Sequence, residues 1–108
     1  MLDMQSSVRV EDFQFPAGSA QLSARLYLPA HTPRVAVVIN SATGVPREYY
    51  QHFATWLAAE RGMACLTYDY RDFGHSLTGP LGASTATMSD WALIDMPAAY
   101  AEMQRRFP

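Results

Sequence analysis

Residues 35–70 read VAVVINSATGVPREYYQHFATWLAAERGMACLTYDY, and this stretch decides the fold. It contains two apolar runs, at residues 35–39 and 63–68, of the kind found in strands covered on both faces of a parallel sheet. Pro46 suits the first turn of a helix, and Gly62 suits its end. Between them an apolar face recurs at helical spacing: Tyr50, Phe53, Ala54, Leu57 and Ala58. We therefore predict a right-handed βαβ unit over residues 35–69.

Two shorter segments with alternating polarity precede this unit. Residues 8–15 and 22–28 alternate apolar and polar side chains, which is the period of a half-buried strand. Residues 16–19, PAGS, have the composition of a turn. The pattern predicts an antiparallel hairpin over residues 8–28.

A loop and one further helix are predicted after the unit. Gly, Ser, Thr and Pro are frequent in residues 74–84, and we place a loop over residues 70–88 and a helix over residues 89–107. Thr87 and Asp90 resemble a capping box. Because Pro97 interrupts the helical pattern, either the helix kinks there or a new helix starts, capped by Asp95. The expected inner face contains Trp91, Ile94, Ala98 and Ala101.

Composition limits the classes of function. The chain has 108 residues, 49% of them hydrophobic, which is enough for one small α/β domain with a core. Its formal charge is −2 and its basic residues are scattered, so no basic patch predicts a nucleic-acid partner. The single Cys65 excludes an internal disulfide and lies in an apolar run, which favours a buried thiol. We see neither a signal peptide nor an apolar run of ~20 residues, and we expect a cytoplasmic protein with no membrane span.

Residues 74–79, GHSLTG, invite comparison with a nucleophile elbow. The elbow needs glycine two residues before and two residues after its serine, because the strained turn has no room for a side chain. Thr78 stands at the second of these positions, and the GPLG sequence at residues 79–82 would break the helix that must follow. We interpret Ser76 as a loop residue; the alternative is an unorthodox nucleophile.

Two motifs resemble those of the α/β-hydrolases. Residues 69–76, DYRDFGHS, resemble the Asp-x-Arg-Gly-x-Gly-x-Ser segment after the fourth strand of many members, where it shapes the wall near the active site. Asp72 stands where that family commonly has glycine, and Asp tolerates the left-handed region better than most residues do. Because charges at the end of a buried strand persist only when paired or hydrogen-bonded, we expect Asp69 and Arg71 to be structural.

The second motif is INSATG at residues 39–44, which lies where the family has His-Gly-x-x-Gly after the third strand. In that family a backbone N–H of this turn stabilises the tetrahedral oxyanion. The resemblance implies that Ala42 provides this N–H and that Thr43, Gly44 and His75 contact the substrate. An ordinary strand-to-helix loop is the alternative.

The resemblance covers most of the chain and is greatest to the serine-aminopeptidase and lysophospholipase-like branch. It implies acyl transfer through a serine intermediate on an ester, thioester or amide, with a small-molecule acyl substrate. The family's triad residues would lie beyond Pro108, so we expect the N-terminal portion of a hydrolase, inactive alone. The alternative is a non-catalytic α/β module for interaction or oligomerisation.

The remaining sequence features concern cofactors, histidine and aromatic side chains, and assembly. Because the sequence has no Cys-x-x-Cys, His-Glu-x-x-His or Gly-x-Gly-x-x-Gly motif, it supports neither a metal nor a dinucleotide, and we expect no cofactor. His31 and His52 are predicted to be solvated, whereas Trp91 and Tyr100 are predicted to lie in the core. The family's sheet order leaves one edge of the strand at residues 35–39 open, so we expect a homo-oligomer through that edge or through exposed apolar faces.

Overall fold

The computed structural model describes residues 8–79 and 84–108, which form a four-stranded mixed sheet. Its order is β1-β2-β4-β3, with β1 at Arg9–Ala17, β2 at Ala20–Leu28, β4 at Ala64–Tyr68 and β3 at Ala36–Ile39. β2 pairs antiparallel with β1 and with β4, whereas β3 runs parallel to β4. The predicted fold class, an α/β chain with a hairpin, a βαβ unit and a further helix, is confirmed.

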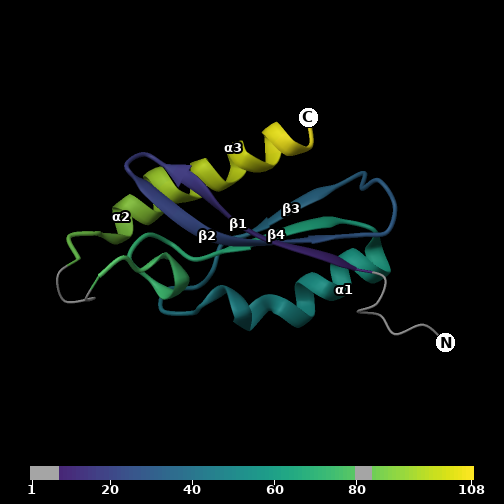
Figure 1. Ribbon diagram of the computed structural model, residues 1–108, viewed down its shortest axis with the longest axis horizontal. Coiled ribbons are helices and arrows are strands. Elements are labelled where there is room, and N and C mark those ends of the chain that lie inside the picture. The colour runs from purple at the N-terminus through teal and green to yellow at the C-terminus, as the bar shows by residue number, and fades with distance from the viewer. Residues whose placement is uncertain (1–7, 80–83) are drawn as a thin grey trace.

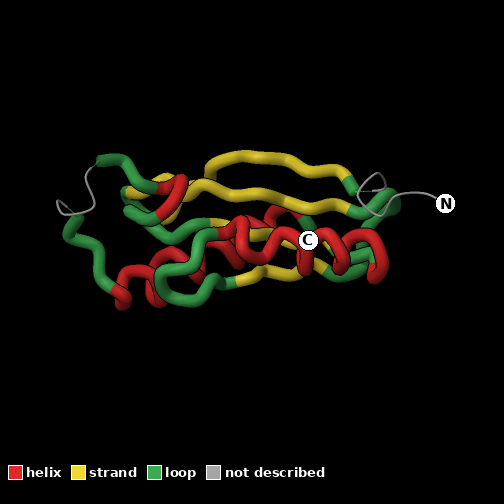
Figure 2. Tube along the Cα trace, turned by 90° about the horizontal axis from the view of Figure 1, so that it is seen from below, coloured by secondary structure: helices red, strands yellow, loops and turns green. Residues whose placement is uncertain are grey.

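Helices cover both faces of this sheet (Figure 1). A 3₁₀ turn, η2 (Arg47–Tyr50), leads into α1 (Gln51–Arg61) on one face. On the other face, α2 (Met88–Asp90), the π-helical turn η5 (Trp91–Asp95) and α3 (Met96–Arg106) follow one another. A short 3₁₀ turn, η3 (Gly74–Ser76), follows β4. Figure 2 shows the strands lying side by side along the length of the molecule.

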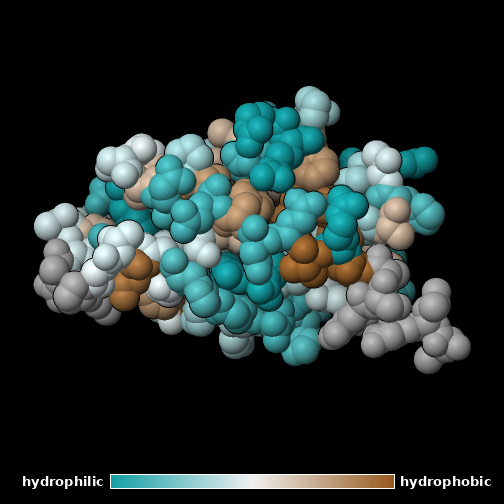
Figure 3. Space-filling view, viewed as in Figure 1, coloured by the Kyte–Doolittle hydropathy of each residue, from teal (hydrophilic) through white to brown (hydrophobic). Residues whose placement is uncertain are grey.

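Alternation along the central strands divides the core into two layers. Leu26 of β2 and Leu66 of β4 face α3, where they pack with Ala99 and Met103. Their neighbours Tyr27 and Cys65 face α1 instead. Every residue of β4 is buried, as the apolar run predicted. On the face shown in Figure 3, hydrophilic residues predominate and hydrophobic ones form small separate areas.

The hairpin turn is shorter than the composition predicted. β1 continues through Pro16 to Ala17, which pairs with Ala20, so only Gly18 and Ser19 form the turn. Gly18 has φ of 60°, which a two-residue hairpin turn requires at its first position. Pro16 fits the strand because β1 is an edge strand, where a missing N–H is tolerated.

β3 differs from the expectation of a strand covered on both faces. It is the other edge of the sheet, and its residues are exposed or only half-buried. In the described part of the chain β3 pairs with β4 alone. The position of β3 beside β4 with one open edge agrees with the predicted strand order.

The inner face of α1 is narrower than its apolar pattern suggested. Ala54, Leu57 and Ala58 are buried, but Phe53 is exposed and stacks on the exposed Trp56.

The predicted inner face of the last helix is only partly right, because Trp91 and Ala98 pack against the core and the other two positions are displaced by one residue. Ile94, Tyr100 and Ala101 are exposed, and the buried positions are Asp95, Ala99, Glu102 and Met103. The cause is the π turn before Pro97, in which Met96 N–H donates to Trp91 O and one extra residue enters the turn. Asp95 does not cap a new helix with its side chain, whereas the Thr87–Asp90 capping box is confirmed.

None of the helices formed by residues 8–79 and 84–108 has the length and apolar character that crossing a bilayer would require.

Candidate functional site

A loop of small residues follows β3 and lies beside the end of β4. Val45 N–H donates to Ala42 O at 3.0 Å, and Gly44 has φ of 78°, so residues 42–45 form a tight turn. Ser41 is buried, whereas Ala42, Thr43 and Gly44 are exposed. The sequence placed the candidate oxyanion N–H and two substrate contacts here, and the structure brings these three residues together on one exposed turn.

Three tyrosine hydroxyls hold this loop. Tyr70 Oη donates to Ser41 O at 2.7 Å, and Tyr68 Oη lies 2.5 Å from Asn40 Oδ1. A tyrosine hydroxyl is protonated at neutral pH, and burial raises the pKa of Tyr68 and of Tyr70 further, so both can donate. The third hydroxyl is an acceptor: Ala42 N–H donates to Tyr50 Oη at 3.0 Å. The candidate oxyanion donor is therefore already hydrogen-bonded in the free chain.

Asp69 connects this loop region to the segment after β4. Its buried carboxylate accepts the backbone N–H of Arg47 at 2.8 Å and that of His75 at 3.0 Å. Its carbonyl accepts from the Ser76 hydroxyl at 2.7 Å. Because the Ser76 oxygen also accepts Ser23 N–H at 2.8 Å and is buried, both of its hydrogen-bonding roles are filled. These contacts favour a structural Ser76 over a nucleophile.

Arg71 and Asp72 shape the same segment. Arg71 Nε donates to Asp95 Oδ1 at 2.9 Å, and Arg71 Nη2 donates to Ala17 O at 2.8 Å. This guanidinium therefore joins the hairpin turn to the helical segment, and the expected pairing of Arg71 is observed. Asp72 has φ of 57°, so it occupies the left-handed turn for which the family commonly uses glycine. Its carboxylate accepts from Ser84 Oγ at 2.7 Å.

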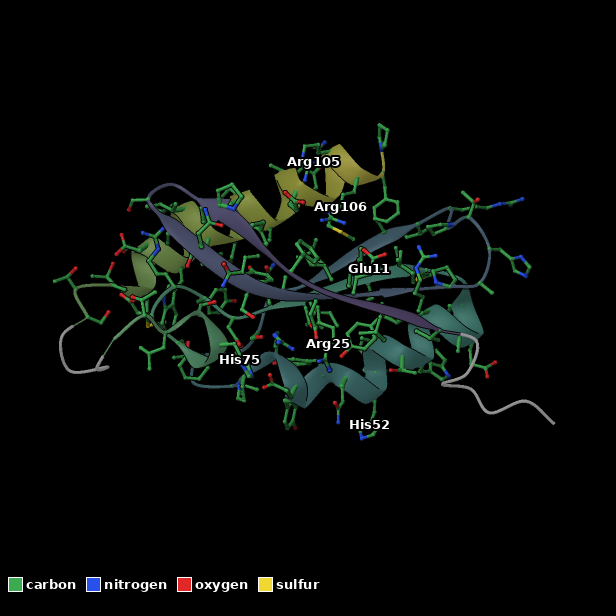
Figure 4. All side chains as sticks on the ribbon, in the orientation of Figure 1. Glu11, Arg25, His52, His75, Arg105 and Arg106 are labelled. Atoms are coloured by element: carbon green, nitrogen blue, oxygen red, sulfur yellow. The ribbon has the colours of Figure 1, made fainter. Side chains whose placement is uncertain are left out.

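His75 has a partner that the sequence did not reveal. Its Nε2 lies 2.7 Å from Oε1 of Glu48, which belongs to η2. The side chain of His75 is 58% exposed and lies on the α1 side of the sheet (Figure 4). Within the described chain, no hydrogen bond joins the His75 side chain to residues 42–44. The predicted grouping of His75 with Thr43 and Gly44 is therefore not supported by a hydrogen bond. His31 and His52 are exposed, as predicted.

A hollow of about 380 Å³ adjoins the segment after β4. The hairpin turn and this segment line it, with Arg71, Asp72 and Ser76 among the lining residues. Its other lining residues are Ser19, Ala20, Gln21, Thr78, Thr85, Ala86 and Asp90. His75, which the sequence placed beside a pocket, does not line it. The lining is polar, but the side chains of Arg71 and Ser76 are committed to hydrogen bonds within the fold.

Among residues 8–79 and 84–108, Glu48, Asp69 and His75 offer possible metal-ligand atoms within 4.8 Å of one another. However, both carboxylate oxygens of Asp69 already accept backbone N–H groups. The buried guanidinium of Arg47 also lies between the two acids, 3.8 Å from Asp69 and 3.4 Å from Glu48. A positive charge in this position opposes the binding of a second cation.

Comparison with known proteins gives structural neighbours only. No family model matches the chain, and no curated protein matches its sequence. An esterase from Pyrobaculum calidifontis superposes with a TM-score of 0.52 and 33% identity over 58% of this chain and 22% of that one. A highly thermostable carboxyl esterase from Bacillus coagulans gives 0.52 and 23% over 65% of this chain and 22% of that one. Vibralactone cyclase gives 0.51 and 16% over 60% of this chain and 21% of that one.

These neighbours define the class of fold. The chain has part of the α/β-hydrolase fold, comprising a hairpin, a βαβ unit and a following helix. It spans about a fifth of the length of each neighbour, 21–22%.

Proposed function

We propose that this chain forms the oxyanion side of a serine-hydrolase site that acts by acyl transfer on a small ester, thioester or amide. The observation that carries the proposal is the exposed turn at residues 42–45, which follows β3 and carries the backbone N–H of Ala42, hydrogen-bonded to Tyr50 Oη in the free chain. Its likeness to structures named as esterases supports the assignment. Backbone N–H groups on such turns stabilise the negative charge that develops on a carbonyl oxygen.

The residues of this chain would bind and orient rather than attack. Ala42 supplies the N–H, which Tyr50 Oη accepts in the free chain, and Thr43 and Gly44 are exposed beside it. Asp69 fixes the start of η2 and the turn at His75, so the loop has a rigid support. A nucleophilic serine and its base are parts that we assign to residues outside this chain, because Ser76 is hydrogen-bonded twice and buried.

The test uses the natural protein expressed from its complete reading frame. We expect it to hydrolyse p-nitrophenyl butyrate and to react stoichiometrically with a fluorophosphonate, with the label on a serine outside residues 1–108. Ser76→Ala should leave the labelling unchanged. Absence of both hydrolysis and labelling would refute the proposal, and a label on Ser76 would refute the role given to that residue. The 108-residue chain alone should have no esterase activity.

A non-catalytic α/β module for interaction or oligomerisation remains the second candidate. The observation that favours it is the open edge of β3. A folded complete protein that assembles but reacts with neither ester nor fluorophosphonate would establish this alternative.

A further inference from the structure

The hydroxyl of Tyr50 accepts the hydrogen bond of the Ala42 N–H, which is the group that the hydrolase proposal needs. Ala42 N–H has one hydrogen, and it points to Tyr50 Oη at 3.0 Å. A substrate oxygen can therefore reach that N–H only if Tyr50 moves away. Otherwise the oxygen meets the hydroxyl of Tyr50 first.

Tyr50 is held in place by several contacts. It is the last residue of η2 and the N-cap residue of α1, with φ of −95° and ψ of 6°. The turn that precedes it is closed by Tyr49 N–H donating to Pro46 O at 3.1 Å and by Arg47 N–H donating to Asp69. The Tyr50 ring is half-buried and packs edge-on against Tyr49, with 5.2 Å between the ring centroids. Rotating the Tyr50 side chain away would break the ring contact with Tyr49 and leave Ala42 N–H unpaired.

The proton of this hydroxyl is free to donate. Tyr50 Oη accepts from Ala42, and among residues 8–79 and 84–108 no acceptor takes its hydrogen. An oxygen that accepts one hydrogen bond becomes a better donor in the next, because the bonds polarise each other. The N–H of Ala42 thus strengthens the O–H of Tyr50.

From these contacts we propose that Tyr50 is a catalytic residue of the hydrolase site, whose O–H donates to the substrate's carbonyl oxygen while Ala42 N–H polarises it from behind. When a serine oxygen adds to the carbonyl carbon and its proton passes to a base, the C=O π pair moves onto the carbonyl oxygen. Tyr50 stabilises that oxyanion by a hydrogen bond and keeps its own proton. This inference rests on the proposed serine-hydrolase function.

The test compares Tyr50→Phe with Tyr49→Phe in the natural full-length protein. Tyr49 is the matched control, because it is adjacent in sequence, 75% exposed, and loses the same single oxygen. We expect Tyr50→Phe to lower kcat by about 100-fold, near the lower end for loss of one oxyanion donor, since Ala42 N–H remains to bind the oxygen directly. Tyr49→Phe should retain kcat within about twofold. Fluorotyrosine at position 50, a stronger donor of the same shape, should retain or raise kcat.

The outcomes distinguish failure of the Tyr50 role from failure of the hydrolase function. If the unmodified protein hydrolyses the ester but Tyr50→Phe retains kcat, the role of Tyr50 is wrong and the hydrolase function stands. A higher kcat in Tyr50→Phe would show that Tyr50 obstructs the N–H, which also overturns the inference. An unmodified protein with no reaction at all refutes the hydrolase function and this inference with it. If Tyr50→Phe unfolds, the fluorotyrosine variant decides, and a large fall in kcat there overturns the role.

Discussion

Asp69 and Arg47 stand 22 positions apart in the sequence, and the Asp69 carboxylate accepts the Arg47 backbone N–H at 2.8 Å. The same carboxylate lies 3.8 Å from the Arg47 guanidinium, and both side chains are buried. One acid at the end of β4 therefore fixes the start of η2, which follows the loop carrying Ala42.

Asp69→Ala should destabilise the fold by about 3–5 kcal/mol, because it leaves a buried guanidinium and two backbone N–H groups without this partner. Asp12→Ala is the control, since the Asp12–Arg25 pair is solvent-exposed and should be worth about 0.2–1 kcal/mol. Urea unfolding of both variants measures the difference. If Asp69→Ala abolished turnover in the natural protein at an unchanged melting temperature, Asp69 would be catalytic and its structural assignment wrong.

Gly74 allows Asp69 to reach its partners. A Cβ at Gly74 would lie 2.7 Å from Asp69 Oδ2, and its φ is 54°. Gly74→Ala should therefore cost about 2–5 kcal/mol from strain and overpacking together. Gly44→Ala has the φ strain without a clash and should cost about 1–2 kcal/mol. Gly79→Ala has neither and should stay within about 0.5 kcal/mol of the parent. Thermal melts of the three variants give the ranking, and equal melting temperatures would show that the contact with Asp69 does not constrain the turn.

Raising the pH above about 9 should lower the free energy of unfolding of this chain. Burial raises the pKa of the Cys65 thiol from 9.0 to about 12, and it also raises the pKa of Tyr68 above its usual 10.0. Above pH 9 the unfolded chain loses protons that the folded chain keeps, so stability is full below pH 9 and falls as pH rises. The slope is at most about 1.4 kcal/mol per pH unit for each group. Urea midpoints between pH 7 and 11 measure it. Cys65→Ala should flatten the slope between pH 9 and 10, and a flat profile in the parent chain would contradict the prediction.

The strand and helix patterns were enough to predict the sheet. Period-two alternation in β1 and β2 and the apolar run in β4 each reflect which faces are buried, and these are local properties of the chain. The same strand and helix patterns predicted the position of the small-residue loop after β3. The buried face of η5 and α3 could not be predicted fully, because a π turn before Pro97 adds one residue to the turn. That face also includes two buried acids, Asp95 of η5 and Glu102 of α3.

The partners of the site residues could not be predicted. Tyr50 reads as one apolar position of a helix, and only the folded chain places its hydroxyl on Ala42 N–H. His75 likewise meets Glu48 through the packing of η3 beside η2. The first contact depends on how the turn after β3 folds back on η2, and the second on how β4 places η3, so hydrophobic periodicity contains neither.

The open edge of β3 leads to a prediction about assembly. Ala64 N–H donates to Val35 O, and Ala36 pairs with Ala64, so in a parallel ladder the N–H groups of Ala36 and Val38 point away from β4. Beside this edge lies a hollow of about 220 Å³, lined by Ala36, Val38, Tyr100, Met103, Gln104 and Phe107. Apolar edges without charge or proline recruit other strands. We therefore expect the 108-residue chain to form a two-fold dimer in which β3 pairs with β3 of a second copy.

Ala36→Lys tests that dimer. It places a charge at an exposed position on the edge, where two copies would bring like charges together, and should weaken the dimer by at least about tenfold in Kd. Ala92→Lys, at an exposed position of η5, adds the same charge away from β3 and should leave Kd unchanged. Sedimentation equilibrium at micromolar concentration measures all three chains. A parent chain that stays monomeric with a cooperative melt would show that the β3 edge does not pair, and equal weakening by both lysines would place the interface elsewhere.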